Sequence, residues 1–384
     1  METLISGSTA YQFWRTPPIV ALLAAGPSDE SVLKRLMSED ELVAFRMDLL
    51  EQLPLLKACS SPKSHIGDSF KAIRSVSALL APSAELPLQV LVDDPRLRRP
   101  SCLLRPSVCS SELPAGFTRA LNDDASIASP ELALLQLASK ASLAQTVLMA
   151  SELCGGFAVY RAPAPIAAKL QELIGSGRLP SIDGWEPCLT SNGRICELWK
   201  RPPLTTPNEL LHLAELSDSR LGANRLRKAA ELVKPDAASP FEVQTGIMLG
   251  FSRRLGGEGF GNFTHNEKAE LSRDAKLLAG RSYCSCDLFW PDGLDVECQS
   301  VQFHDSSDSF ISDSNRTAAL SLMGIQVLPL TFEQLKQPDN FDAFSNAVAK
   351  ALGRKRKPKS ALQIEAARRL RDEVFCNWWT LPYL

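Results

Sequence analysis

Asp287 and Glu297 are two acidic residues whose spacing would bring their carboxylates together in one β-hairpin. The sequence Pro291-Asp292-Gly293 separates two apolar runs and is typical of a tight turn. If Asp292 is the apex of a three-residue loop, Asp287 lies directly opposite Glu297. Opposed residues of two paired strands have Cβ atoms roughly 4.5–5.5 Å apart. Two carboxylates that close repel each other unless a cation or a proton lies between them.

The pair therefore predicts a site for a hard divalent cation, Mg²⁺ or Mn²⁺, which prefers oxygen ligands. Such an ion lowers the pKa of a bound water and stabilises the charge that develops on a phosphate. The alternative is that Asp287 and Asp295 lie on a solvated face of the hairpin, with Glu297 exposed.

The same register sorts the hairpin side chains by polarity, because side chains alternate along a strand. The predicted apolar face carries Cys284, Cys286, Leu288, Trp290, Leu294, Val296 and Cys298. The predicted polar face carries Ser285, Asp287, Phe289, Asp295, Glu297 and Gln299. Zinc is disfavoured because the three cysteines all fall on the apolar face, where Cys packs as a small hydrophobic residue.

The elements around the hairpin predict an α/β arrangement. Ser239, Pro240 and Glu242 are typical of a helix start, with Ser239 at the N-cap and Glu242 in a capping box. An irregular stretch follows a glycine-rich loop and leads to the hairpin. The other predicted elements are a helix over 240–254, a helix near 312–323, a strand over 325–330 and a helix that ends at about 353.

The bulk composition indicates a soluble, cytoplasmic protein that does not enter a membrane. The 384 residues are 45% hydrophobic and 22% charged, with a net charge of -2. The N-terminus lacks the pattern of a signal peptide, and the ten cysteines are scattered without a CxxC pair.

N-terminal to the hairpin and its neighbouring elements, Ser129-Pro130 predicts a helix start, and residues 208–232 predict a helix. The expected regions are a mixed α+β part over 1–218, a helix end and linker over 219–238, a nuclease-like domain over 239–353, and a basic tail over 354–384.

Residues 239–350 resemble the Vsr-like branch of the PD-(D/E)XK nuclease superfamily. The resemblance rests on the order of an acidic residue in a first helix, D-L in one strand, E-x-D or a relative in the next, an aromatic-His pair, a D-x-x-R helix and a G-x-x-V-L strand that leads to a Thr. These fall on Glu242, Asp287-Leu288, Glu297 to Gln299, Phe303-His304, Asp313 with Arg316, Gly324 to Leu328, and Thr331. It implies a restriction-endonuclease-like three-layer core. More weakly, ISGSTAYQFWR near the N-terminus and IASPELALLQLA at 127–138 resemble AbiEi-type antitoxin relatives.

The resemblance implies a catalytic set of Asp287, Glu297, Gln299, His304 and Glu242, with Asp287 and Glu297 on the metal. Gln299 stands where the superfamily has lysine, so a neutral amide replaces a positive charge near the attacking water. His304 would then accept the proton of the water. For Glu242 and His304 the alternatives are a helix cap and a histidine bonded to the backbone.

Nucleic acid would contact basic residues outside the acidic core. Residues 239–350 carry 15 acidic and 9 basic side chains, whereas 351–384 carry eight basic and three acidic ones. Phosphate contacts are expected from Arg316 and from the run Arg354, Lys355, Arg356 and Lys357, unless that run is a solvated tail. The last residues, 376–384, are apolar enough to pack back or to contact a protein partner.

The expected function is metal-dependent DNA hydrolysis in defence or repair. The alternative is an inactive nuclease fold that acts as an antitoxin-like transcriptional regulator.

Overall fold

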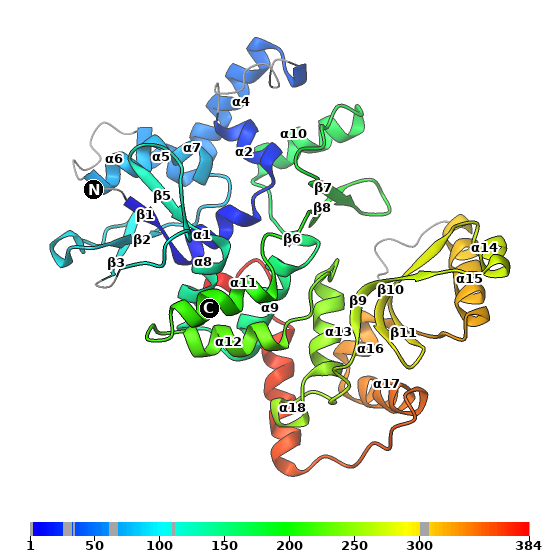
Figure 1. Cartoon of the computed structure of the whole chain (residues 1–384). Coiled ribbons are helices and arrows are strands. Elements are labelled where there is room, and N and C mark those ends of the chain that lie inside the picture. Colours follow the sequence, from blue (N-terminus) through cyan, green and yellow to red (C-terminus); the bar gives the residue numbers. More distant parts are fainter. Residues whose placement is uncertain are drawn as a thin grey trace.

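The chain has an α/β fold with mixed sheets, which a computed structural model shows in Figure 1. The structure describes residues 3–25, 33, 35–60, 68–109, 112–299 and 307–383. Within these residues the strands form sheets of five, four and three members, and helices pack around each of them. The predicted α/β class is confirmed.

The five-stranded sheet belongs to the N-terminal part and has the order β3-β2-β1-β5-β4. It is mixed, because β1 runs antiparallel to β2 and parallel to β5. The strands are β1 (Thr3–Ile5), β2 (Leu88–Val92), β3 (Leu104–Val108), β4 (Thr118–Ala120) and β5 (Ala125–Ala128). The first helices are α1 (Gly7–Arg15), α2 (Pro18–Ala25), α4 (Glu39–Gln52), α5 (Pro54–Ser60), α6 (Asp68–Ser75) and α7 (Ser77–Leu80), with the 3-10 turn η2 (Pro95–Leu97).

The middle of the chain is mainly helical around the antiparallel sheet β6-β8-β7. The helix start at Ser129-Pro130 is confirmed, since Ser129 Oγ accepts a hydrogen bond from Leu132 N. The single helix expected over 208–232 is wrong: Gly222, with φ +96°, separates two helices, and a Cβ there would lie 2.6 Å from the Leu135 carbonyl. The elements are α8 (Pro130–Ala138), α9 (Leu143–Cys154), β6 (Phe157–Val159), α10 (Ala164–Gly175), β7 (Glu186–Leu189), β8 (Ile195–Lys200), α11 (Pro207–Leu216) and α12 (Ala223–Leu232).

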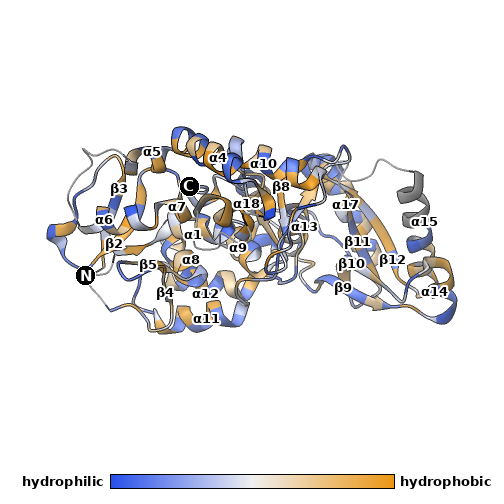
Figure 2. Ribbon diagram, turned by 90° about the horizontal axis from the view of Figure 1, so that it is seen from above, coloured by the Kyte–Doolittle hydropathy of each residue, from blue (hydrophilic) through white to orange (hydrophobic). Residues whose placement is uncertain are grey.

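The third sheet follows and has the order β12-β11-β10-β9, with β12 parallel to β11 and the other neighbours antiparallel. Figures 1 and 2 place α13 on one side of this sheet and α14 and α15 on the other. The elements are α13 (Pro240–Gly250), η3 (Arg253–Leu255), β9 (Thr264–Glu270), α14 (Arg273–Ala279), β10 (Tyr283–Trp290), β11 (Leu294–Gln299), α15 (Ser307–Leu322), β12 (Gln326–Thr331), α16 (Phe332–Lys336) and α17 (Pro338–Ala351).

The predicted hairpin register is confirmed where β10 pairs with β11. Leu288 pairs with Val296, Phe289 with Asp295 and Trp290 with Leu294. The irregular stretch expected before the hairpin is wrong, because residues 264–270 form β9 and residues 273–279 form α14. β9 carries mostly polar residues, and it lies at the sheet edge, where polar side chains discourage pairing with another chain.

The predicted apolar face is wrong for Cys284 and Cys286. They pack with Ala275 of α14 and Ala319 of α15, whereas Leu288 and Trp290 belong to the large core that includes α13. The change of partners falls at Asp287. On β9, the residue opposite Asp287 is Asn266, which has a φ of +50°. These two residues do not pair, although the pairs on both sides of them, Cys286 with Glu267 and Leu288 with His265, are formed. A local irregularity in the sheet thus separates the two sets of apolar residues.

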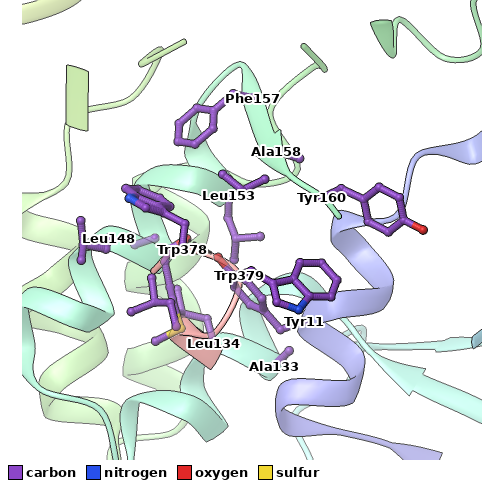
Figure 3. Close-up of a cluster of buried hydrophobic side chains, with 14 of the residues drawn as sticks. Tyr11, Ala133, Leu134, Leu148, Leu153, Phe157, Ala158, Tyr160, Trp378 and Trp379 are labelled. Atoms are coloured by element: carbon purple, nitrogen blue, oxygen red, sulfur yellow. Dashed lines mark hydrogen bonds between the residues drawn. The ribbon is translucent and has the colours of Figure 1, made fainter. Parts of the chain in front are cut away.

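The C-terminal residues join the two halves of the chain. Helix α18 (Ala361–Val374) packs against α9 and α13, and Gln244 Nε2 donates a hydrogen bond of 3.0 Å to the Val374 carbonyl. Beyond it, Trp378 and Trp379 enter the N-terminal core, as Figure 3 shows, before the turn η5 (Leu381–Tyr383). Trp379 lies 6.0 Å from Tyr160 between ring centroids. Residues from 361 onward are therefore part of the packed fold.

Candidate active site

Asp287 lies where β10 and β11 diverge, one residue beyond their last backbone pair, Leu288 with Val296. Its Oδ2 accepts a hydrogen bond of 2.8 Å from the backbone N of Cys298, so the side chain replaces a ladder contact. Burial, followed by the nearby Glu297 and Glu242, raises the pKa of Asp287 to about 8. These causes show that the three carboxyl groups share one mostly buried site, as the hairpin geometry predicted for the first two.

Glu297 is held by a cation from the chain itself. Arg316 of α15 donates to Glu297 Oε1 and to the carbonyl of Ser285, and its Nη2 lies 3.7 Å from Asp295 Oδ2. The side chain of Arg316 is only 16% exposed and that of Glu297 14%. Burial alone would raise the pKa of Glu297, but the hydrogen bond from Arg316 outweighs it and holds the pKa below its ordinary value. Arg316 therefore neutralises the centre in this structure.

Asp295 is a site residue that the sequence analysis placed on the polar face without a role. The reading of a solvated face is wrong for it, because it is fully buried and its carboxyl group lies beside the Glu297 carboxylate and the Cys286 thiol. Burial, followed by the neighbouring Glu297, raises the pKa of Asp295 to about 10. The residue is therefore protonated at neutral pH. The sequence offered only its spacing from Glu297, two residues along the same strand, as a signal.

Glu242 caps the first turn of α13 and also borders the site. Its Oε2 accepts hydrogen bonds from Ala238 N at 2.8 Å and Asn266 Nδ2 at 2.7 Å, and its Oε1 accepts from Ser239 Oγ at 2.8 Å. Ser239 Oγ in turn accepts from Glu242 N at 3.2 Å, which confirms the predicted N-cap. Burial raises the pKa of Glu242, and the charge of Glu297 adds to this effect. Both oxygens are occupied, so Glu242 supports the site from behind.

The other predicted catalytic residues lie at or beyond the end of β11. Gln299 is exposed, pairs with Thr331 of β12 and lies two residues beyond Glu297 on the same strand. His304 lies outside the described residues, as does the side chain of Asp313. The position of Gln299 leaves it able to orient a water by hydrogen bonding.

The basic run is not brought next to the carboxylates. Arg253, just beyond the C-terminal end of α13, donates to the carbonyl of Lys357, whereas Glu242 lies in the first turn of that helix. The two sites are thus separated by the length of α13, about 16 Å for eleven residues. Arg354, Lys355 and Lys357 are exposed there. They form a surface that is distinct from the carboxylate site.

Arg356 points inward from this run and has a different environment. It forms paired hydrogen bonds of 2.9 and 3.0 Å with Glu258, whose side chain is 1% exposed, and Lys359 adds a third at 2.6 Å. A further contact joins Arg356 to Asp342 of α17 at 2.5 Å. Arg356 therefore anchors the segment between α17 and α18.

The donor chemistry of the site suits a hard divalent ion, although Arg316 now meets its need for positive charge. Asp287 and Glu297 supply carboxylate oxygens, and burial, followed by the charges of Glu297 and Glu242, raises the pKa of Asp287. Within the part of the chain that the structure describes, no group of three or more His, Cys, Asp or Glu side chains is arranged to hold a metal ion. Because Arg316 already contacts Glu297, an ion bound by Asp287 and Glu297 would displace Arg316 from that carboxylate.

Comparisons with known proteins add no assignment. No protein-family model, curated protein or solved structure matches this chain. Among the described residues, no helix combines the length and the apolar composition needed to cross a membrane.

Proposed function

We propose that the chain is a metal-dependent nuclease-like protein that hydrolyses DNA phosphodiester bonds, and that residues 239–353 form a restriction-endonuclease-like core. The order α13, β9, α14, β10, β11, α15, β12, with β12 parallel to β11, supports the proposed core. The observation that carries the function is the buried pair of Asp287 and Glu297 at the divergence of β10 and β11. A nuclease needs such a pair to hold an ion against a phosphate.

Asp287 and Glu297 would hold Mg²⁺ or Mn²⁺, which supplies a more acidic bound water and charge stabilisation at the phosphate. Glu242 and Asn266 position the site, because their hydrogen bond joins the first turn of α13 to β9. Gln299, at the exposed end of β11, would orient the water, and His304 is proposed as its proton acceptor. Arg316 would exchange its contact with Glu297 for a substrate phosphate, which a guanidinium binds well.

A cleavage assay tests this function. The full chain is incubated with supercoiled, linear and single-stranded DNA in Mg²⁺, Mn²⁺ or EDTA. We expect metal-dependent cleavage that Asp287→Asn abolishes. Asp292→Asn is the matched control, because this substitution removes the same charge at the exposed turn of the same hairpin. Cleavage that persists in Asp287→Asn would overturn the assignment.

A second function is favoured by two observations in the site. Gln299 replaces the lysine of the superfamily pattern, and Arg316 already neutralises Glu297. Both suit a nuclease fold that binds DNA without cutting it, as an antitoxin-like transcriptional regulator would. DNA binding that is unchanged by EDTA and by Asp287→Asn, without cleavage of any substrate, would support this second function.

The exposed residues Arg354, Lys355 and Lys357 are the proposed phosphate contacts under either function. Removing n such contacts lowers the slope of log affinity against log salt by about 0.9n for duplex DNA. The triple change to glutamine should therefore weaken DNA binding and lower this slope by about 2.7. Arg356 is left intact in this variant, because it holds Glu258.

A further inference from the structure

A cavity of about 200 Å³ lies between the two halves of the chain, and one of its lining residues, His265, contacts the backbone of Asp287. It is enclosed by α9, the end of α12 with the segment after it, α13, and the chain from Phe251 to His265. Three glycines line it: Gly246 and Gly250 of α13, and Gly261. A Cβ on Gly246 would lie 3.0 Å from Phe263 Cζ and 3.1 Å from His265 Nε2. The glycines thus let both rings lie directly against the backbone of α13.

Lys234 supplies a positive charge at this cavity. It is half-buried, and its Nζ lies 5.9 Å from the centroid of the Phe263 ring. Within the described residues it forms no ion pair with a carboxylate, although the cavity also includes Glu231, which is exposed. A cation beside an aromatic ring and without an acidic partner is suited to an anionic ligand.

His265 supplies a hydrogen-bond acceptor next to Phe263, with 5.2 Å between the ring centroids. It is 6% exposed, and its Nδ1 lies 3.2 Å from the carbonyl of Asp287, so Nδ1 carries the proton and donates. With Nδ1 as the donor, Nε2 is the acceptor of the neutral ring, and it lies beside Gly246 in the cavity wall.

Ser151 of α9 adds a third polar group. It is 3% exposed and lines the cavity. The remaining wall is apolar, with Val147, Ile247 and the Phe263 ring. This combination of a flat apolar wall and a few separated polar groups is typical of small-molecule sites.

We propose that this cavity binds a compact aromatic carboxylate that also carries a hydroxyl or amino group. The carboxylate pairs with Lys234, the ring packs against Phe263, and the hydroxyl or amino group donates to His265 Nε2. The size agrees, because a cavity of about 150 Å³ accommodates benzene and this one leaves room for two substituents. The proposal does not depend on nuclease activity.

Calorimetry on the full chain with 4-hydroxybenzoate and 4-hydroxybenzamide tests the proposal. The two probes differ in the group that would contact Lys234, an anionic carboxylate in the acid and a neutral carboxamide in the amide. We expect the acid to bind about tenfold more tightly than the amide, which is the typical value of one charge-assisted hydrogen bond. Lys234→Met should remove this preference. Lys228→Met, an exposed lysine on α12, should keep it.

Proton NMR of the histidine rings locates the bound probe, because the chain has only 4 histidines. Saturating 4-hydroxybenzoate should shift the ring resonances of His265 and leave those of the exposed His212 unmoved. The proposal is overturned by the absence of saturable binding at millimolar probe, by equal affinities for acid and amide, or by shifts confined to other histidines. Glu231→Gln should tighten acid binding, and weaker binding in this variant would contradict the assignment of the ligand as a simple anion.

Discussion

Replacing Asp287 with Asn should stabilise the metal-free protein at pH 8 and leave its stability at pH 4 almost unchanged. The folded-state pKa is about 8, against an ordinary value of 3.8. A carboxyl group with a raised pKa holds its proton in the folded state at a pH where the unfolded chain has lost it. The contribution of Asp287 to the free energy of unfolding of the wild type therefore falls as pH rises from about 4 to about 8, and is flat above that. Asn cannot ionise, so this loss is absent from the variant.

The magnitude follows from the same two values. A difference of one pKa unit corresponds to about 1.4 kcal/mol, so the interval from 3.8 to about 8 gives an upper limit of about 6 kcal/mol at pH 8. Rearrangement of side chains and entry of water reduce the cost of a buried charge well below such a limit. Asn also keeps a carbonyl oxygen that can accept from Cys298 N. We expect a gain of about 2–3 kcal/mol at pH 8.

Urea unfolding in EDTA at pH 4, 6, 7 and 8 measures this gain directly. Asp292→Asn serves as the control, and a change at that exposed turn should stay within about 0.5 kcal/mol. Mg²⁺ should then remove most of this difference. At a concentration 100 times its dissociation constant, the ion would stabilise the wild type by about 2.7 kcal/mol and the variant not at all. A variant that is less stable than the wild type at pH 8, or that gains equally from Mg²⁺, would refute the reasoning.

Three further substitutions test the buried ion pairs, each by urea unfolding at pH 7. Arg316→Ala leaves Glu297 buried without its cation and should lower the free energy of unfolding by about 3 kcal/mol in EDTA. Mg²⁺ should restore a part of this loss. If Mg²⁺ has no effect on the stability of the variant, Arg316 and the ion do not share Glu297. Burial would raise the pKa of Glu258, but the hydrogen bonds from Arg356 and Lys359 hold this pKa below its ordinary value of 4.5. The ionised Glu258 therefore stabilises the fold fully above pH 4.5, and this stabilisation is lost as the pH falls below that value. Glu258→Gln should therefore cost about 2–3 kcal/mol at pH 7, expose the run at Arg354 and Lys355 to trypsin, and differ little from the wild type in acid. Glu152→Gln leaves Arg15, 1% exposed, without its carboxylate and should cost about 3–5 kcal/mol, whereas a loss below 1 kcal/mol would mean that water reaches the guanidinium.

The hairpin was predictable because its signals are local. A Pro-Asp-Gly turn and the alternation of side chains on both sides determine the register, and three observed pairs follow it. The cap at Ser239 depends in the same way on residues three apart. Strand β9 was not predictable from its own residues, because this edge strand is mostly polar and lacks the alternation of apolar and polar side chains that marks a strand in a sequence. Its pairing with β10 is decided by the strand that it meets.

The electrostatics of the site depend on contacts that are distant in the sequence. Arg316 reaches Glu297 from α15, and nothing in the spacing of the hairpin indicates that contact. The burial of Asp295 has the same origin, because Arg316 and the residues around Cys286 cover a face that the strand pattern alone marks as polar. The sequence could therefore identify which carboxylates meet, whereas the state of their protons depends on a helix that follows them in the chain.

Arg316 also bears on how the two proposed functions can be separated. The guanidinium and a divalent ion both need Glu297, so they compete for it, and metal affinity should be weak while Arg316 stays in place. A substrate phosphate offers Arg316 another anionic partner, which would free Glu297 at the moment when the ion is needed. A nuclease built in this way should bind Mg²⁺ more tightly in the presence of DNA, and by linkage should bind DNA more tightly in Mg²⁺ by the same factor. A regulator that uses Arg316 only to neutralise a buried carboxylate should show neither effect, and the ratio of DNA affinities in Mg²⁺ and in EDTA measures the difference.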